Sequence, residues 1–141
     1  MKRLSINDAL MQTAKIWSQR GTCNRKSVGA VIARDTRIIS TGYVGSPPGL
    51  PHCTDAGCLI DPHTGGCVRT LHAETNAIAF AAAKGLSVER TSLYVTLSPC
   101  VSCSKLIVAS RISEVYYNEA YRDSSGLDYL LMGGVSVLQI K

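Results

Sequence analysis

A strand runs directly into a helix within the segment Ser92-Leu93-Tyr94-Val95-Thr96-Leu97-Ser98-Pro99-Cys100-Val101-Ser102-Cys103. The half that ends at Leu97 is rich in β-branched, aromatic and other apolar side chains, which favour a strand. Ser98 and Pro99 are typical of helix starts, so we predict that they cap the helix that follows. Cys100 and Cys103 then lie on one face of its first turn, where both thiols can reach the same point.

His72-Ala73-Glu74 lies upstream and begins a second predicted helix that ends at Gly85. A structural zinc site closes its coordination shell with four protein ligands, whereas a catalytic site uses three and leaves one position for water or substrate. His72, Cys100 and Cys103 supply three ligands, and Glu74 remains free to move protons. A Cys-x-x-Cys pair alone fits structural zinc or a redox pair equally well, and His-Ala-Glu alone predicts nothing. Together they predict a catalytic zinc site.

The remaining chain alternates between helical and strand patterns. Ser5 and Asp8 resemble a capping box, and an apolar helical face follows them until Gly21. Further expected elements are strands at Val28–Arg34 and Arg37–Gly42 joined by a tight turn at Asp35-Thr36, strands at Ser113–Asn118 and Val135–Ile140, and a helix at Ser125–Met132. Strands joined through helices favour parallel neighbours, and the opening hairpin supplies an antiparallel pair. We therefore expect one α/β domain over residues 1–141, with a mixed five-stranded sheet and helices on both faces.

Four further cysteines lie outside the predicted catalytic site: Cys23, Cys53, Cys58 and Cys67. The segment from Pro47 to Arg69 holds three of them, is rich in Gly, Pro and Asp, and has few large apolar residues with which to order itself. Four thiolates can close a tetrahedral structural zinc site, and His52 or His63 could replace one of them. Two simpler alternatives are a disulfide framework and ordinary reduced thiols.

The distribution of charged and apolar residues along the chain bears on where the protein is located. The first residues carry charge too early for a secretory signal, and the longest apolar run, Ala77 to Ala83, is far too short to span a membrane. We expect a cytoplasmic protein.

The formal net charge is +5, and basic residues are concentrated near the amino terminus. Much of this charge could belong to a solvated surface. Asn24-Arg25-Lys26 differs because it immediately precedes the first strand, where a loop can reach the mouth of a site. These side chains suit the phosphate of a nucleotide substrate. The same charge also permits nucleic acid, so charge alone does not choose between these ligands.

The motifs resemble the deoxycytidylate (dCMP) deaminase branch of the cytidine deaminase superfamily. The resemblance is carried by four segments: Ser27–Ile32, Gly42–Pro47, His72–Ile78 and Tyr94–Cys103. It implies a three-layer cytidine-deaminase-like fold and a zinc hydroxide that attacks C4 of cytosine, converting dCMP to dUMP and ammonia and supplying dUMP for thymidylate synthesis. It also implies a homo-oligomer, commonly a hexamer, activated by dCTP and inhibited by dTTP with Mg²⁺ on the phosphates.

The resemblance assigns roles to particular residues. His72, Cys100 and Cys103 match the zinc ligands and Glu74 the proton shuttle. The remaining matches are substrate contacts at Ala73, Leu97, Ser98 and Tyr121, and a regulatory region at Gly42, Tyr43, Gly45 and Asn76. Val44 departs from the family, which usually has Asn there, and this puts a sugar contact and the regulatory pocket in question.

Two other functions use the same motifs. A tRNA or single-strand deaminase would share the zinc chemistry, but the chain has one Phe, one Trp and no basic run interleaved with aromatic residues, so nucleic acid is a less favoured partner. A catalytically silent zinc module that binds a nucleotide or a protein is the other alternative, and the presence of Glu74 argues against it.

Overall fold

The computed structural model describes residues 1–141. Its elements are α1 (Ile6–Ser18), β1 (Gly29–Arg34), β2 (Arg37–Tyr43), α2 (Cys53–Ala56), α3 (Ala73–Ala83), β3 (Ser92–Leu97), α4 (Val101–Ala109), β4 (Glu114–Glu119), α5 (Ser125–Met132) and β5 (Ser136–Gln139). Every predicted helix and strand is present, with ends shifted by at most a few residues. The short helix α2 was not predicted.

The five strands form one mixed sheet in the order β2-β1-β3-β4-β5. As predicted, β1 and β2 form an antiparallel hairpin, and β4 is parallel to both β3 and β5. The expectation that helix-connected strands are neighbours was wrong for β2 and β3, because β1 lies between them and pairs antiparallel with each. The burial of β1 explains its central place: five of its six residues are buried, so it needs cover on both faces.

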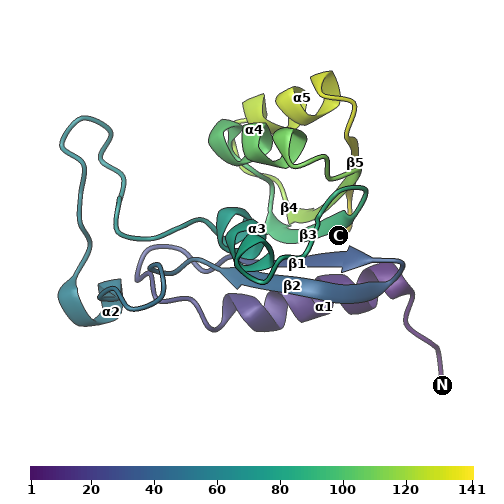
Figure 1. The fold of residues 1–141 in the computed structure, drawn as a ribbon, viewed down its shortest axis with the longest axis horizontal. Coiled ribbons are helices and arrows are strands. Elements are labelled where there is room, and N and C mark those ends of the chain that lie inside the picture. Colours follow the sequence, from purple (N-terminus) through teal and green to yellow (C-terminus); the bar gives the residue numbers. More distant parts are fainter.

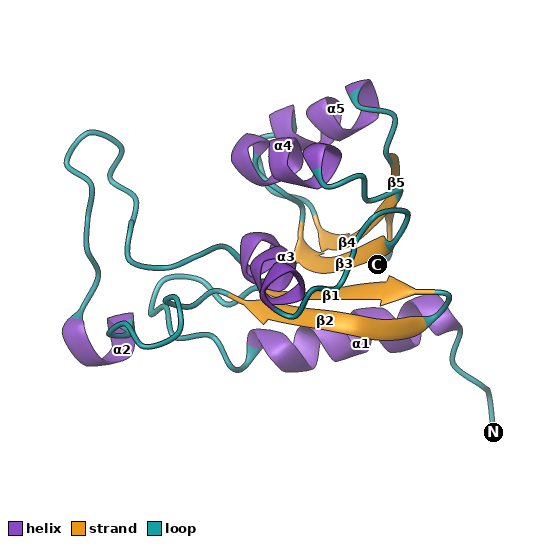
Figure 2. Ribbon diagram, in the orientation of Figure 1, coloured by secondary structure: helices purple, strands orange, loops and turns teal.

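Helices cover both faces of the sheet, which confirms the predicted three-layer architecture (Figures 1 and 2). On one face, α1 packs Leu10, Met11 and Ala14 against Val31 and Tyr94. On the other face, α3, α4 and α5 cover a larger core that includes residues of β1, β3 and β4. This second face carries both of the predicted zinc-binding segments.

The hairpin turn agrees with its prediction. Asp35 and Thr36 have φ values of 50° and 68°, which suit a two-residue turn whose twist matches that of the strands.

The predicted cap of α4 was wrong. The N-cap residue is Cys100. Ser98 follows directly after the end of β3, and its N–H donates to the Glu119 carbonyl at 2.9 Å. The Ser98 hydroxyl instead accepts a hydrogen bond from the Tyr121 N–H at 2.7 Å. Ser98 therefore joins the ends of β3 and β4, and the helix starts two residues later than expected.

Residues 47–69, called the arm below, project from the body of the molecule (Figure 1). Leu50, Leu59, Ile60 and Val68 of the arm are exposed, so apolar burial contributes little to its order. None of the helices combines the length and the apolar character needed to cross a membrane.

Candidate active site

The first cysteine–histidine group forms where α3 and α4 begin. His72 and Cys100 are the N-cap residues of these helices, both have extended backbone conformations, and neither side chain caps its own helix. His72 Nδ1 lies 3.5 Å from Cys100 Sγ and 3.3 Å from Cys103 Sγ. Three potential metal donors thus converge on one point, all within 4.8 Å of one another.

Two glycines allow the helix ends to sit this close to the rest of the fold. A Cβ on Gly42 of β2 would lie 2.3 Å from the Ala73 carbonyl oxygen, so glycine is required for α3 to pack on the strand. A Cβ on Gly126 of α5 would collide with the backbone of Pro99 and Cys100. Both contacts fix the positions from which the donors project.

The donor set suits zinc. Hydrogen bonds from Cys103 and from His72 lower the pKa of Cys100 to about 3, whereas the bond to Cys100 together with burial raises the pKa of Cys103. The same contact with Cys100 raises the pKa of His72. One thiolate is therefore already available at neutral pH, and two sulfurs with one imidazole nitrogen match the ligands that zinc prefers. A set of three leaves one coordination position open, as in catalytic sites.

Glu74 lies in the first turn of α3, outside this group of donors. Its side chain is buried, and burial raises its pKa to about 7. A carboxyl group with a pKa near the working pH can both accept and return a proton. Glu74 also lines the cavity beside the donors, so its position suits a general acid and base.

The cavity at this site has a volume of about 510 Å³. Of the residues predicted to contact substrate, it brings together Arg25, Lys26, Ala73, Leu97, Ser98 and Tyr121. Asn24 does not line the cavity, and its side chain is exposed to solvent, so its contact with substrate stays a prediction.

Sequence reasoning missed other parts of the cavity wall: Val28, Thr70, Arg122 and the arm residues from Thr64 to Cys67. Arg122 could have been found, because it is a basic residue that directly follows the predicted contact Tyr121. Lys26 Nζ and the Arg122 guanidinium lie 5.0 and 6.0 Å from the centre of the Tyr121 ring. The ring thus places two cations at the cavity.

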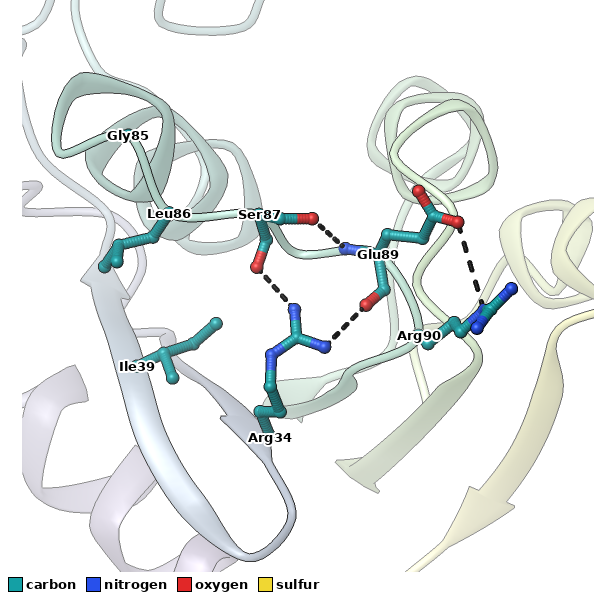
Figure 3. A pocket seen from close by; sticks show the side chains of 7 residues that line it. All are labelled: Arg34, Ile39, Gly85, Leu86, Ser87, Glu89 and Arg90. Carbon is teal, nitrogen blue, oxygen red and sulfur yellow. Dashed lines mark hydrogen bonds and ion pairs between the residues drawn. The ribbon is translucent and has the colours of Figure 1, made fainter.

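A second hollow of about 490 Å³ lies at the opposite ends of the strands (Figure 3). There the Arg34 guanidinium donates to the carbonyls of Ser87 and Glu89 at 2.7 and 3.0 Å. Arg34 thereby ties β1 to the connection between α3 and β3. None of its lining residues belongs to a metal-binding group.

A second group of thiols forms in the arm. Cys53, Cys58 and Cys67 lie within 4.8 Å of one another, with Cys53 Sγ and Cys67 Sγ 3.6 Å apart. Although burial opposes it, N–H donors from Arg69 and Leu59 lower the pKa of Cys67 to about 7, whereas burial raises that of Cys53 to about 12. A thiol that ionises near neutral pH is suited to metal binding.

The fourth predicted ligand of this group, Cys23, is not with the other three. It lies in the cavity wall, and its sulfur accepts a hydrogen bond from the Arg25 N–H at 3.4 Å. His52 Nδ1 is buried without a hydrogen-bond partner, although the ring is outside the three-thiol group. His63 is exposed near the tip of the arm. The three thiols therefore form an incomplete tetrahedral set.

The predicted regulatory residues gather between β2 and α3. The Asn76 side chain donates to the Tyr43 carbonyl at 2.8 Å, and Gly45 bridges to Leu71. Val44 is buried and belongs to both the core and the cavity wall. Gly42 and Asn76 thus connect β2 to the helix that carries Glu74.

Comparisons with known proteins agree with this geometry. The family described as "Cytidine and deoxycytidylate deaminase zinc-binding region" matches residues 4–119. ComE operon protein 2 of Bacillus subtilis is 43% identical, over 100% of this chain and 74% of that protein. The deoxycytidylate deaminase of Enterobacteria phage T4 is 35% identical, over 93% of this chain and 88% of that protein. The structure of the dCMP deaminase from cyanophage S-TIM5 in complex with dCMP and dUMP superposes with a TM-score of 0.85 and 32% identity, over 99% of this chain and 100% of that one.

Proposed function

This chain belongs to the cytidine and deoxycytidylate deaminase family, and from that premise we propose that it hydrolyses dCMP to dUMP and ammonia. The observation that carries the proposal is the group of His72, Cys100 and Cys103, of which His72 and Cys100 line the same cavity as the buried Glu74. Relatives named for this activity support it. The dUMP formed would supply thymidylate synthesis.

The chemistry divides between the metal and the chain. His72, Cys100 and Cys103 would hold one zinc ion, which, when bound, supplies a Lewis acid that activates water near neutral pH. Glu74 would take one proton from the attacking water and deliver it to N3 of the cytosine ring, and would then move the proton of the new C4 hydroxyl to the departing amino group, which leaves as ammonia. Its raised pKa supports both directions of transfer. The backbone at Ala73, Leu97 and Ser98 would hold the edge of the pyrimidine.

Cations at the cavity support a phosphorylated substrate. Arg25, Lys26 and Arg122 all line it, and a phosphate near charge −2 forms strong charge-assisted hydrogen bonds with such donors. Each bond of this kind contributes about 1.5–3 kcal/mol, which a nucleoside without phosphate cannot obtain.

The test is a comparison of kcat/KM on cytidine, deoxycytidine, dCMP and dCTP with zinc-loaded protein. We expect dCMP to be the best substrate, at least ~10-fold above deoxycytidine, because one charge-assisted hydrogen bond alone accounts for that factor. Equal efficiency on dCMP and deoxycytidine would contradict the assignment. Activity on single-stranded nucleic acid or tRNA, without activity on dCMP, would replace the dCMP assignment by that of a nucleic-acid deaminase.

We also propose a second, structural zinc ion on the thiols of Cys53, Cys58 and Cys67. The exposed apolar side chains of the arm support this role, because the arm needs a source of order other than burial. The fourth ligand would come from Cys23 or His52.

Regulation is the finest part of the proposal. Membership in this branch implies a homo-oligomer, commonly a hexamer, with dCTP as activator, dTTP as inhibitor and Mg²⁺ on the triphosphate. The link from Gly42, Tyr43, Gly45 and Asn76 to α3 supports a route by which a ligand near β2 could displace Glu74. We expect sigmoidal dCMP kinetics that dCTP makes hyperbolic and dTTP suppresses. Hyperbolic kinetics indifferent to both triphosphates, in active oligomeric protein, would show that this regulation is absent.

A further inference from the structure

The tip of the arm forms part of the cavity wall. Residues Thr64 to Cys67 line the same cavity as His72 and Glu74, although they lie in a segment that otherwise projects from the body. Because Thr64, Gly65 and Gly66 are exposed to solvent, this segment needs internal contacts to hold a defined position beside a substrate.

The tip has such contacts. Gly65 N–H donates to the Asp61 carbonyl and Asp61 N–H donates to the Gly66 carbonyl, both at 2.8 Å, which closes a tight turn. Ile60 pairs with Cys67 at the base of this turn, and Cys67 lies in the three-thiol group with Cys53. The turn is thus fixed to the base of the arm.

The base of the arm is in turn attached to the loop that carries Arg25. Thr54 N–H, in α2, donates to the Thr22 carbonyl at 3.2 Å. The arm and the loop around Arg25 are therefore joined at Thr22, and a second contact between them lies at the arm tip.

The contact at the tip involves the Arg25 side chain itself. Arg25 Nη1 donates to the Gly65 carbonyl at 3.2 Å, and the side chain is otherwise exposed. Arginine has five N–H donors, so the remaining donors stay available to an anion in the cavity. Lys26 and Arg122 are placed by the Tyr121 ring, whereas Arg25 has only this carbonyl.

We propose that the Gly65 carbonyl positions the Arg25 guanidinium for the 5′-phosphate, so that the arm tip sets the preference for a nucleoside monophosphate over the nucleoside. The inference rests on the proposed function and adds a positioning residue to it. An exposed arginine normally loses rotamer freedom when it binds an anion, and a side chain that is already fixed loses less. The benefit reaches only ligands that carry the phosphate.

Gly65 offers a sharp test because its backbone is left-handed, with φ +73°, and a Cβ would meet nothing within 4 Å. Gly65→Ala therefore causes no collision but disfavours the conformation that directs the carbonyl to Arg25, whereas Gly65→Asn tolerates it. Gly49→Ala is the matched control: it places the same strain, at φ +85°, in open space elsewhere in the arm and away from the cavity.

For Gly65→Ala we expect KM for dCMP to rise about three- to tenfold with kcat nearly unchanged, as for the loss of one preorganised hydrogen bond. Deoxycytidine kinetics should not change. Gly49→Ala should behave like the parent, Gly65→Asn should have a smaller effect on KM for dCMP than Gly65→Ala, and Gly65→Ala should add nothing in an Arg25→Gln background. Calorimetric titration with dUMP and with deoxyuridine should give the same pattern in Kd without any turnover.

The outcomes separate this inference from the proposed function. If the parent prefers dCMP and Gly65→Ala behaves like Gly49→Ala, or weakens nucleoside and nucleotide equally, the positioning role is wrong and the proposed function stands. If the parent does not turn over dCMP but binds dUMP more tightly than deoxyuridine, and Gly65→Ala reduces that difference, the proposed function is wrong and the positioning role stands. Equal binding of dUMP and deoxyuridine by the parent, together with equal efficiency on dCMP and deoxycytidine, overturns both.

Discussion

The two cysteine groups of this protein differ in what holds them in place. His72, Cys100 and Cys103 project from helices that pack on the main core, and Cys103 is itself buried. Cys53, Cys58 and Cys67 lie in an arm whose large apolar side chains are exposed. The first group is therefore positioned by the fold, whereas the second must itself position the chain around it. Metal loss should have different consequences at the two groups.

The largest expected effect is on the group held by the core. Cys103→Ala leaves two donors, which rarely hold zinc, so turnover should fall at least ~1000-fold while the fold persists. Zinc content per chain should drop by one equivalent, measured by mass spectrometry of metals. Retention of the full zinc content with normal turnover would contradict the assignment of this group.

Glu74→Gln tests the proton transfer while the zinc ligands stay unchanged. The substitution keeps the volume of the buried side chain but cannot accept a proton, so kcat should fall at least ~100-fold with zinc content unchanged. Glu89→Gln, which alters a partly exposed carboxylate at the other hollow, is the control and should have no effect on kcat. Normal turnover by Glu74→Gln would remove this residue from the mechanism.

Cys67→Ser tests whether the second group orders the arm. We expect the protein to lose one zinc equivalent and about 4 °C or more of thermal stability, with the zinc at His72 retained. Zinc content and a melting curve on the same sample distinguish this from loss of the catalytic ion. The same measurements on Cys23→Ser and His52→Ala identify the fourth ligand. A zinc content of one per chain in fully loaded parent protein would contradict the proposal of a second zinc site.

The smallest effect concerns the contact that joins β2 to α3. Asn76→Ala removes the hydrogen bond to the Tyr43 carbonyl and should lower the free energy of unfolding by about 1 kcal/mol. Chemical denaturation measures the change, and zinc content should stay constant at both groups. A variant as stable as the parent would show that packing at Gly42 alone holds α3 in place.

The zinc motif and the fold class could be predicted from the sequence because both depend on local patterns. The Ser92–Leu97 strand and the Asp35-Thr36 turn were located correctly from side-chain types alone. The arm contacts could not be predicted, because Gly65 and Arg25 are distant in sequence and meet through backbone geometry. Arg25 lines the cavity and the adjacent Asn24 does not, for a related reason: adjacency in sequence does not decide which side chain faces the cavity.

The sequence by itself determined the donor types, their spacing and the extra carboxylate, since a Cys-x-x-Cys pair at a helix start places two thiols together in any fold. Tertiary structure alone decided that β1 separates β2 from β3, that Cys23 is not part of the three-thiol group of the arm, and that the arm returns to the cavity. The physical reason is the range of the interactions: helix caps and turns are set by neighbours in the chain, whereas burial and hydrogen bonds between distant segments depend on how the whole chain packs.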